Sequence, residues 1–410
     1  MIYFYAMNST EIFQLALQLS KPWFVSAVRF ETAPDGKMDL HIDIGFDRSF
    51  KFSPEGKVHD TKSKKWRYLN FFEYRCYLHS EVPRIKSAEG VRMVEVPWAR
   101  QGSGFTLLFE AFSLALIERE MPVNKAADLL GEYPQRLWTV FNYWIQIAYN
   151  ADDQSQVTKL GIDETSARKG HDYVTVAIDI DKRRVIHATP GKDQQTIDKI
   201  REHLISKNVD PQDITDICID MSPAFIAGIL DHFPNTSITF DRFHVVKLLN
   251  EAMDEVRKKE AREHDILKGH KYTLLKAEHN LSKRQKMERE ELIELLPNIG
   301  NAYRLKMLFQ DFWDFDNKQD AAAFLAFWCD LVDEHGIVPF KNFAKTIKGH
   351  WSGIVNYIES HIANGVLEGI NNKIQLAKRR ARGYRNINNF INMIYFLAGK
   401  LKFNFPHDFT

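Results

Sequence analysis

Cysteine is scarce in this chain of 410 residues, and its scarcity excludes two kinds of architecture. The three cysteines, Cys76, Cys218 and Cys329, stand at unrelated spacings, and no CxxC pair occurs. A disulfide framework or a cysteine zinc knuckle needs several cysteines at regular short spacings. We therefore expect no structural zinc, and we expect a reducing compartment.

The chain also lacks long apolar runs and an excess of charge of one sign. The longest apolar run, FINMIYFLAG at 390–399, is too short to cross a membrane, and the first residues have no basic lead of a signal peptide. We expect a cytoplasmic protein with no membrane partner. Lys and Arg number 55 against 54 Asp and Glu, so any nucleic-acid surface must come from local clustering of charge.

The first part of the chain reads as extended structure. Residues 22–51 alternate apolar and polar side chains around a Pro-Asp-Gly turn at 34–36, which predicts a β-hairpin. The polar stretch SPEGKVHDTKSKKWR that follows predicts a loop, and further extended segments reach residue 104. We interpret 1–104 as a small β-rich module.

Residues 105–150 change to helical periodicity. The segments TLLFEAFSLALIERE, VNKAADLLG and PQRLWTVFNYWIQIAY predict a helix, a short helix that ends at Gly131, and a third helix. This layout is typical of a helix-turn-helix DNA-binding region. The alternative is a three-helix packing unit that makes no contact with DNA.

The remaining sequence predicts an α/β domain interrupted by helices. After the polar linker NADDQSQ, residues 157–243 predict three strands, a helix, a strand, a helix and a strand, which together form a mixed sheet with helices on its faces. Residues 244–361 predict a large all-α insertion. Residues 362–410 predict helices that close the α/β domain.

Three acidic residues at the ends of predicted elements are candidates for chemistry. Asp163 ends the strand KLGID, Asp220 ends the strand ICID, and Glu368 lies at the start of a helix. A carboxylate at the end of a buried strand is costly unless it is paired, hydrogen-bonded or bound to metal. Each one alone is more simply explained as a cap or an ion-pair partner. We expect Gly161, on the same strand face as Asp163, to leave open space beside that carboxylate.

The helix that begins near Glu368 becomes strongly basic. Glu368, Asn372, Gln375, Arg379 and Arg382 follow helical spacing and form one stripe. Such a helix places a metal ligand next to a track for DNA phosphates, although a charged surface helix is the simpler alternative. The candidate DNA-binding residues are Lys373, Lys378, Arg379, Arg380, Arg382 and Arg385.

Carboxylate oxygens suit Mg²⁺ or Mn²⁺, and two such ions about 4 Å apart can hold the attacking and leaving oxygens of a phosphodiester displacement. We therefore predict two Mg²⁺ (or Mn²⁺) ions, with Asp163, Asp220 and Glu368 as metal ligands and catalytic residues. Glu164 and Asp241 are candidate auxiliary ligands. His244 is a candidate metal neighbour or general base, with a helix-capping structural role as the alternative.

At these residues the chain resembles bacterial insertion-sequence transposases of the DDE type, and among them the ISL-three family. The matching stretches include GIDETSARKGHDYVTVAIDID and HIANGVLEGINNKIQLAKRRARGYRNINNFINMIYF, and the similarity covers most of 158–400. The resemblance implies a ribonuclease-H-like catalytic fold with its triad at Asp163, Asp220 and Glu368. It also implies binding of terminal inverted repeats in double-stranded DNA, cleavage there, and strand transfer into target DNA. A homodimer or higher oligomer on DNA, associated with the bacterial nucleoid, is the expected assembly.

The N-terminal region departs from that family, whose members there usually carry a cysteine zinc ribbon before the helix-turn-helix. Where the ribbon would have its knuckles, this chain reads SPEGK at 53–57 and KSAEGV at 86–91. Either this degenerate zinc-ribbon region folds without metal, or recognition of the transposon ends is weakened. Two further hypotheses stay open: a ribonuclease-H-like DNA nuclease without strand transfer, and a DNA-binding remnant that does not cut.

Overall fold

The computed structural model describes residues 8–52, 57–87, 90–168, 172–360 and 364–403. The chain forms two compact units, Met1–Asn150 with Lys402–Thr410, and Ala151–Leu401, and each is described by itself. Among the helices so described, none is long and apolar enough to cross a membrane. The elements of the first unit are α1 (Ser9–Ala16), β1 (Trp23–Thr32), β2 (Met38–Phe46), β3 (Lys57–Phe71), β4 (Tyr74–Ser87), β5 (Gly90–Met93), α2 (Leu107–Glu118), α3 (Val123–Leu130) and α4 (Pro134–Asn150).

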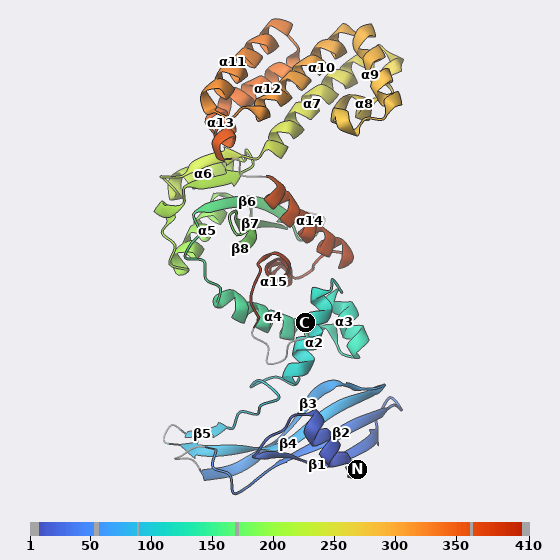
Figure 1. The fold of residues 1–410 in the computed structure, drawn as a ribbon, viewed down its shortest axis with the longest axis vertical. Coiled ribbons are helices and arrows are strands. Elements are labelled where there is room, and N and C mark those ends of the chain that lie inside the picture. The colour runs from blue at the N-terminus through green and yellow to red at the C-terminus, as the bar shows by residue number, and fades with distance from the viewer. Residues whose placement is uncertain (1–7, 53–56, 88–89, 169–171, 361–363, 404–410) are drawn as a thin grey trace, which may run out of the picture. The chain divides into compact units, whose positions relative to one another are not determined.

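A five-stranded sheet forms the β-rich module, with strand order β1-β2-β4-β3 and β5 paired to β4 (Figure 1). The predicted hairpin is confirmed: β1 and β2 pair antiparallel, and Gly36 takes the positive φ of 78° at their turn. The loop predicted over the polar stretch is wrong, because from Lys57 onward that stretch is the long strand β3. As an edge strand, β3 pairs only with β4 among the described strands, and charged side chains such as Lys62 protect such an edge from pairing with another chain.

Aromatic residues build the core of this module. The ring of Trp98 packs edge-on against Trp23 and Trp66, with ring centroids 5.0 and 5.6 Å apart. Cys76 is buried in the same cluster, and burial raises the pKa of its thiol to about 12. A protonated thiol in an apolar core behaves as a small hydrophobic side chain, so the module has a core of its own without cysteine ligands.

The three helices α2, α3 and α4 confirm the predicted helix-turn-helix arrangement. Gly131 ends α3 in the left-handed conformation, with φ of 66°, and α4 begins three residues later. The buried guanidinium of Arg67, from β3, lies 3.4 Å from the carboxylate of Glu132 in the turn and donates to the carbonyl oxygen of Leu130 at 3.4 Å. These contacts attach the turn of the helix-turn-helix to the sheet.

The second unit contains a mixed sheet, four helices near it and a helical insertion. Its sheet has the order β10-β9-β6-β7-β8, with β6, β9 and β10 parallel and β7 antiparallel to both of its neighbours. The elements are β6 (Lys159–Ser166), β7 (Tyr173–Asp179), β8 (Arg184–Pro190), α5 (Gln194–Ser206), β9 (Asp216–Ile219), α6 (Pro223–His232), β10 (Ser237–Phe240), α7 (Arg242–Glu260), α8 (Lys271–Leu275), α9 (Lys283–Leu295), α10 (Pro297–Gln310), α11 (Lys318–His335), α12 (Val338–Gly349), α13 (Trp351–Ser360), α14 (Asn364–Arg380) and α15 (Ile387–Ala398).

Helices lie on both faces of this sheet, as predicted from the sequence. Alternating apolar residues such as Leu160 and Ile162 point from β6 into the core that α5 and α6 share. On the opposite face, α14 packs on β6, and the hydroxyl of Tyr395 in α15 meets the backbone of Ala188 in β8 (Figure 1). The predicted mixed α/β architecture is confirmed.

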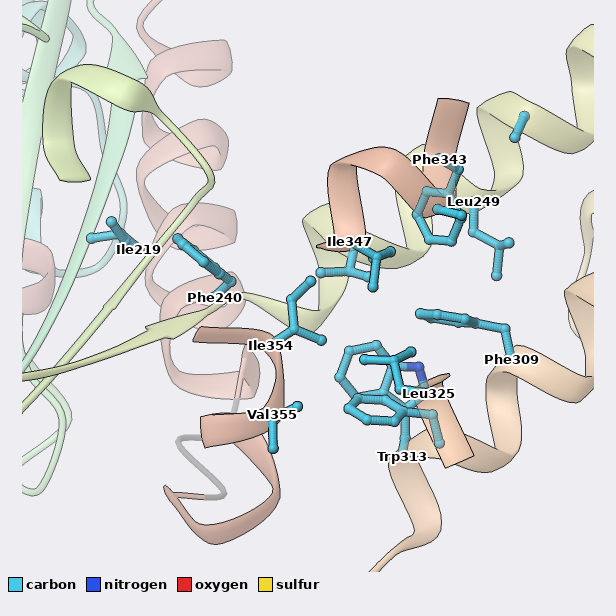
Figure 2. Close-up of a cluster of buried hydrophobic side chains, with 14 of the residues drawn as sticks. Ile219, Phe240, Leu249, Phe309, Trp313, Leu325, Phe343, Ile347, Ile354 and Val355 are labelled. Carbon is cyan, nitrogen blue, oxygen red and sulfur yellow. The ribbon is translucent and has the colours of Figure 1, made fainter. Parts of the chain in front are cut away.

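The helical insertion shares one continuous apolar core with the sheet. Figure 2 shows Ile219 and Phe240 from the sheet beside Ile354 of α13, which leads on to Phe309 and Leu325 deeper in the insertion. Helix α7 begins directly after β10, and α13 returns to pack on the same strand. The insertion is therefore fixed to the sheet at the strand that ends at Phe240.

Candidate active site

Three aspartates occupy one level of three adjacent parallel strands. Asp220 and Asp241 directly follow β9 and β10, but the prediction that Asp163 ends its strand is wrong, because β6 continues to Ser166 by pairing with β7. The parallel register pairs Gly161 of β6 with Cys218 of β9, and Ile219 of β9 with Phe240 of β10. Extending these registers places Asp163 beside Asp220, and Asp220 beside Asp241. Carboxyl ends of parallel strands form one edge of a sheet, where α/β proteins commonly bind ligands. Asp241, predicted as an auxiliary residue, therefore lies in the same row as the two predicted catalytic aspartates.

Helix α14 lies along β6 and brings its polar side chains to this row. A Cβ atom at Gly161 would lie 2.8 Å from Cδ1 of Leu367 and 2.8 Å from Cδ1 of Ile180. The expectation of open space beside Asp163 is thus wrong at Gly161, because the missing side chain lets α14 approach the strand. One turn further along α14, the side-chain amide of Asn371 donates a hydrogen bond to Oδ2 of Asp163.

Two more contacts continue the same line along α14. The amide of Gln375 donates to the hydroxyl of Thr165 at 3.0 Å, and Nζ of Lys378 donates to the carbonyl oxygen of Ser166 at 2.9 Å. Glu368, near the start of the helix, is exposed. Its charge still acts on the row, since it raises the pKa of Asp241.

The ionised forms of Asp163 and Asp241 are disfavoured in this fold. Burial raises the pKa of Asp163, and neighbouring Asp220 adds to the shift against hydrogen bonds from the Glu164 amide and Asn371. Burial also raises the pKa of Asp241, with further contributions from Asp163 and Glu368. Burial is the largest cause of both shifts, and it disfavours the ionised carboxylates because they lose contact with water.

The auxiliary candidates surround the same row. Burial raises the pKa of Glu164, Asp220 and Asp163 raise it further, and Lys192 opposes the shift. The ring of His244, in the first turn of α7, has Nε2 3.9 Å from Oδ2 of Asp241. His244 also lowers the pKa of Asp163, so it lies close enough to act on both aspartates.

The residues fit oxygen-ligated divalent cations in their chemistry. In the segments that the structure describes, no Lys or Arg forms an ion pair with Asp163, Asp220 or Glu368. Added positive charge would relieve the repulsion among these carboxylates, and hard oxygen donors select Mg²⁺ or Mn²⁺. Among the same residues, however, no three His, Cys, Asp or Glu side chains are grouped closely enough to hold an ion as placed. Binding would therefore require some of the candidate ligands to move closer together.

The predicted DNA-binding residues divide into two groups. Lys378 is engaged with Ser166, as described above. Arg379, Arg382 and Arg385 are exposed at the end of α14 and just beyond it, and Lys373 is exposed one turn after Gly369. The backbone of Tyr384 donates to Ala167 at 3.2 Å, so the segment after α14 lies beside the end of β6.

Asn371 is the residue of this site that the sequence analysis missed. Its contact with Asp163 could have been anticipated from spacing, because Leu367, Asn371, Gln375 and Lys378 follow helical periodicity and share one face. Of the predicted stripe, Gln375 contacts β6, whereas Glu368, Asn372, Arg379 and Arg382 are exposed. The apolar contact of Leu367 at Gly161 decides which face meets the strand.

Comparison with known families agrees with these observations. Residues 160–394 match the family described as a transposase, in the DDE class of ISL3 elements, and residues 94–145 match the helix-turn-helix domain of transposase family ISL3. The first match covers more than half of the chain, so the chain belongs to the ISL3 family of DDE transposases.

Individual relatives extend the similarity over most of the chain. The chain is 29% identical over 343 residues to the transposase for insertion sequence element IS1001 of Bordetella parapertussis, covering 80% of this chain and 83% of the relative. It is 25% identical over 353 residues to the transposase for insertion sequence element IS1557 of Mycobacterium tuberculosis, covering 79% of each. The predicted resemblance to the ISL-three family is confirmed.

Proposed function

We propose that this transposase binds the terminal inverted repeats of its insertion sequence, cleaves DNA there, and joins the freed ends to target DNA. The observation that supports this most is the row formed by Asp163, Asp220 and Asp241, with α14 bonded to it through Asn371. Membership in a DDE family sets the reaction class. The row supplies carboxylates, the kind of ligand that this chemistry uses.

In this proposal Asp163, Asp220 and Glu368 are the catalytic carboxylates and hold two Mg²⁺ or Mn²⁺ ions. When bound, such ions supply Lewis acidity at the attacking and leaving oxygens of the scissile phosphate. Asp241 and Glu164 add negative charge around the site. His244, whose Nε2 lies 3.9 Å from Oδ2 of Asp241, is proposed as a metal neighbour or general base.

The exposed arginines at the end of α14 are proposed to hold the DNA backbone. Eleven residues separate Glu368 from Arg379, which is about 16 Å along a helix and about five base-pair steps of DNA. The α2–α4 region is proposed to bind the inverted repeat. Pairing two transposon ends is proposed to need a homodimer or larger assembly. The β-rich module that precedes α2 is proposed to act without zinc.

The decisive experiment incubates the protein with Mg²⁺ or Mn²⁺ and a labelled duplex that carries the terminal repeat of its element. Cleavage at the repeat boundary with joined products is the expected result. Cleavage without joining would favour a ribonuclease-H-like nuclease, and binding without cleavage in either metal would favour a non-catalytic remnant. Asp163→Ala and Glu368→Ala should each abolish cleavage while leaving DNA binding, and cleavage that survives either change would refute the assigned site.

A further inference from the structure

The contacts between α14 and β6 differ in what they can do for the reaction. Leu367 fills the space over Gly161, Gln375 bonds to Thr165, and Lys378 bonds to Ser166, so these three contacts seat the helix on the strand. The contact from Asn371 is the one of this set that reaches a proposed catalytic carboxylate. Loss of a contact that only holds the helix on the strand should therefore affect the reaction differently from loss of the contact between Asn371 and Asp163.

Both oxygens of the Asp163 carboxylate accept a hydrogen bond. The backbone amide of Glu164 donates to Oδ1 at 2.7 Å, and the side-chain amide of Asn371 donates to Oδ2. Two donors on opposite oxygens fix the rotation of the carboxylate group. Every carboxylate oxygen has a second lone pair, so both oxygens keep the capacity to bind a cation.

The donor from α14 is also neutral. The positive charge of a Lys or Arg donor would compete with a metal ion for the carboxylate. An amide can orient a carboxylate without that competition. We infer that Asn371 is a positioning residue that holds Asp163 in the orientation needed to bind metal, an inference that rests on the proposed role of Asp163.

Hydrogen-bond partners of metal ligands typically change metal affinity or activity by 10- to 100-fold when they are removed. Asn371→Ala should therefore raise the dissociation constant for Mn²⁺ by about 10- to 100-fold. The Mg²⁺ concentration that gives half-maximal cleavage should rise by a similar factor. Cleavage should recover in part at saturating metal, because Asp163 itself is still present.

The test uses the whole chain and four variants, Asn371→Ala, Asn371→Leu, Gln375→Ala and Asp163→Ala. Free Mn²⁺ is titrated by electron paramagnetic resonance in the absence of DNA, and cleavage is measured against Mg²⁺ concentration. Asn371→Leu removes the donor while keeping nearly the same volume, so it carries the test if the alanine variant does not fold. Gln375→Ala is the matched control, because it removes the next polar contact of the same helix face without touching Asp163.

Two results would overturn the inference. One is a folded Asn371→Leu protein whose affinity for Mn²⁺ equals that of the wild type. The other is an equal loss of affinity in Gln375→Ala, which would mean that Asn371 only seats the helix. A wild-type protein that cleaves and an inactive Asp163→Ala variant would leave the proposed function standing in both cases. If Asp163→Ala does not alter Mn²⁺ binding or cleavage, the proposed function and the inference fail together.

Discussion

The contact between Gly353 of α13 and Phe240 of β10 gives a sharp test of how the insertion is attached to the sheet. A Cβ atom at Gly353 would lie 2.4 Å from Cε2 and 2.5 Å from Cδ2 of the Phe240 ring. That ring is only 5% exposed and also packs edge-on against His350, with centroids 5.1 Å apart. Because the ring is rigid and its surroundings are filled, it has no free space to turn into. Gly353→Ala must therefore shift the ring or the helix against neighbouring side chains, at a cost in stability.

The expected magnitude follows from overpacking. Inserting a methyl group into a well-packed core typically costs about 1–3 kcal/mol. Alanine also favours a helix over glycine by up to about 1 kcal/mol, which masks part of this cost. Gly349, at the end of α12, corrects for the masking, since nothing lies within 4 Å of a Cβ placed there. Gly353→Ala should therefore be about 1–3 kcal/mol less stable than Gly349→Ala.

Thermal unfolding followed by circular dichroism measures this difference. For a unit the size of Ala151–Leu401, 1 kcal/mol corresponds to about 2–4 °C, so the two variants should differ by about 2–12 °C in Tm. Shortening the ring with Phe240→Leu should shrink the difference to below about 0.5 kcal/mol, because coupled residues do not contribute additively. The reasoning is refuted if Gly353→Ala is as stable as Gly349→Ala in the wild-type background.

Four other outcomes are expected. Asp163→Asn should abolish cleavage without lowering the Tm of the metal-free protein, because burial already disfavours the charged carboxylate; a large drop in Tm would show a structural role instead. Replacing Arg379 and Arg382 together by Ala should weaken DNA binding and reduce the magnitude of the slope of log K against log salt by about 1.8. Titrations at several salt concentrations measure this slope, and an unchanged slope would show that neither arginine contacts DNA phosphates. Burial lowers the pKa of the stacked rings of His187 and His203 to about 3 and about 4, so below about pH 6.5 the unfolded chain binds more protons than the folded one and stability falls as the pH drops. In denaturant titrations, His203→Gln should lose less stability than the wild type between pH 6.5 and 4, and an equally steep loss would contradict this. Zinc chelators should leave the unfolding of the β-rich module unchanged, and a Tm that falls with chelation would reveal a metal site there.

Much of the second unit could be predicted because its strands have short, continuous apolar sequences. Runs such as DICI and SITF, each followed by an aspartate, locate β9 and β10 and the residues just beyond them. The sequence does not say which strands are neighbours. The placement of Asp241 beside Asp220 depends on the parallel pairing of β9 with β10, and that pairing joins segments about twenty residues apart.

The wrong predictions concern an edge strand of the sheet and the face of a helix that packs on it. The polar stretch that forms β3 carries few apolar residues because an edge strand is partly solvated, and that composition is also typical of a loop. On α14, both the basic stripe and the stripe through Asn371 obey helical spacing, so periodicity alone cannot decide which one meets β6. The decision rests on a single missing side chain at Gly161, which has meaning only when the opposing Leu367 is known.

The attachment of the insertion at β10 limits how such proteins can diversify. A block of helices joined by flexible linkers could be exchanged between relatives as an independent cassette. Here the first helix continues from the strand that precedes Asp241, and the last helix packs on that strand through a glycine matched to one aromatic ring. An insertion transplanted from a relative would fit only if its α13 matched the aromatic ring on β10. We therefore expect natural length variation to fall among α8 to α12, where the chain can change without disturbing the row of carboxylates.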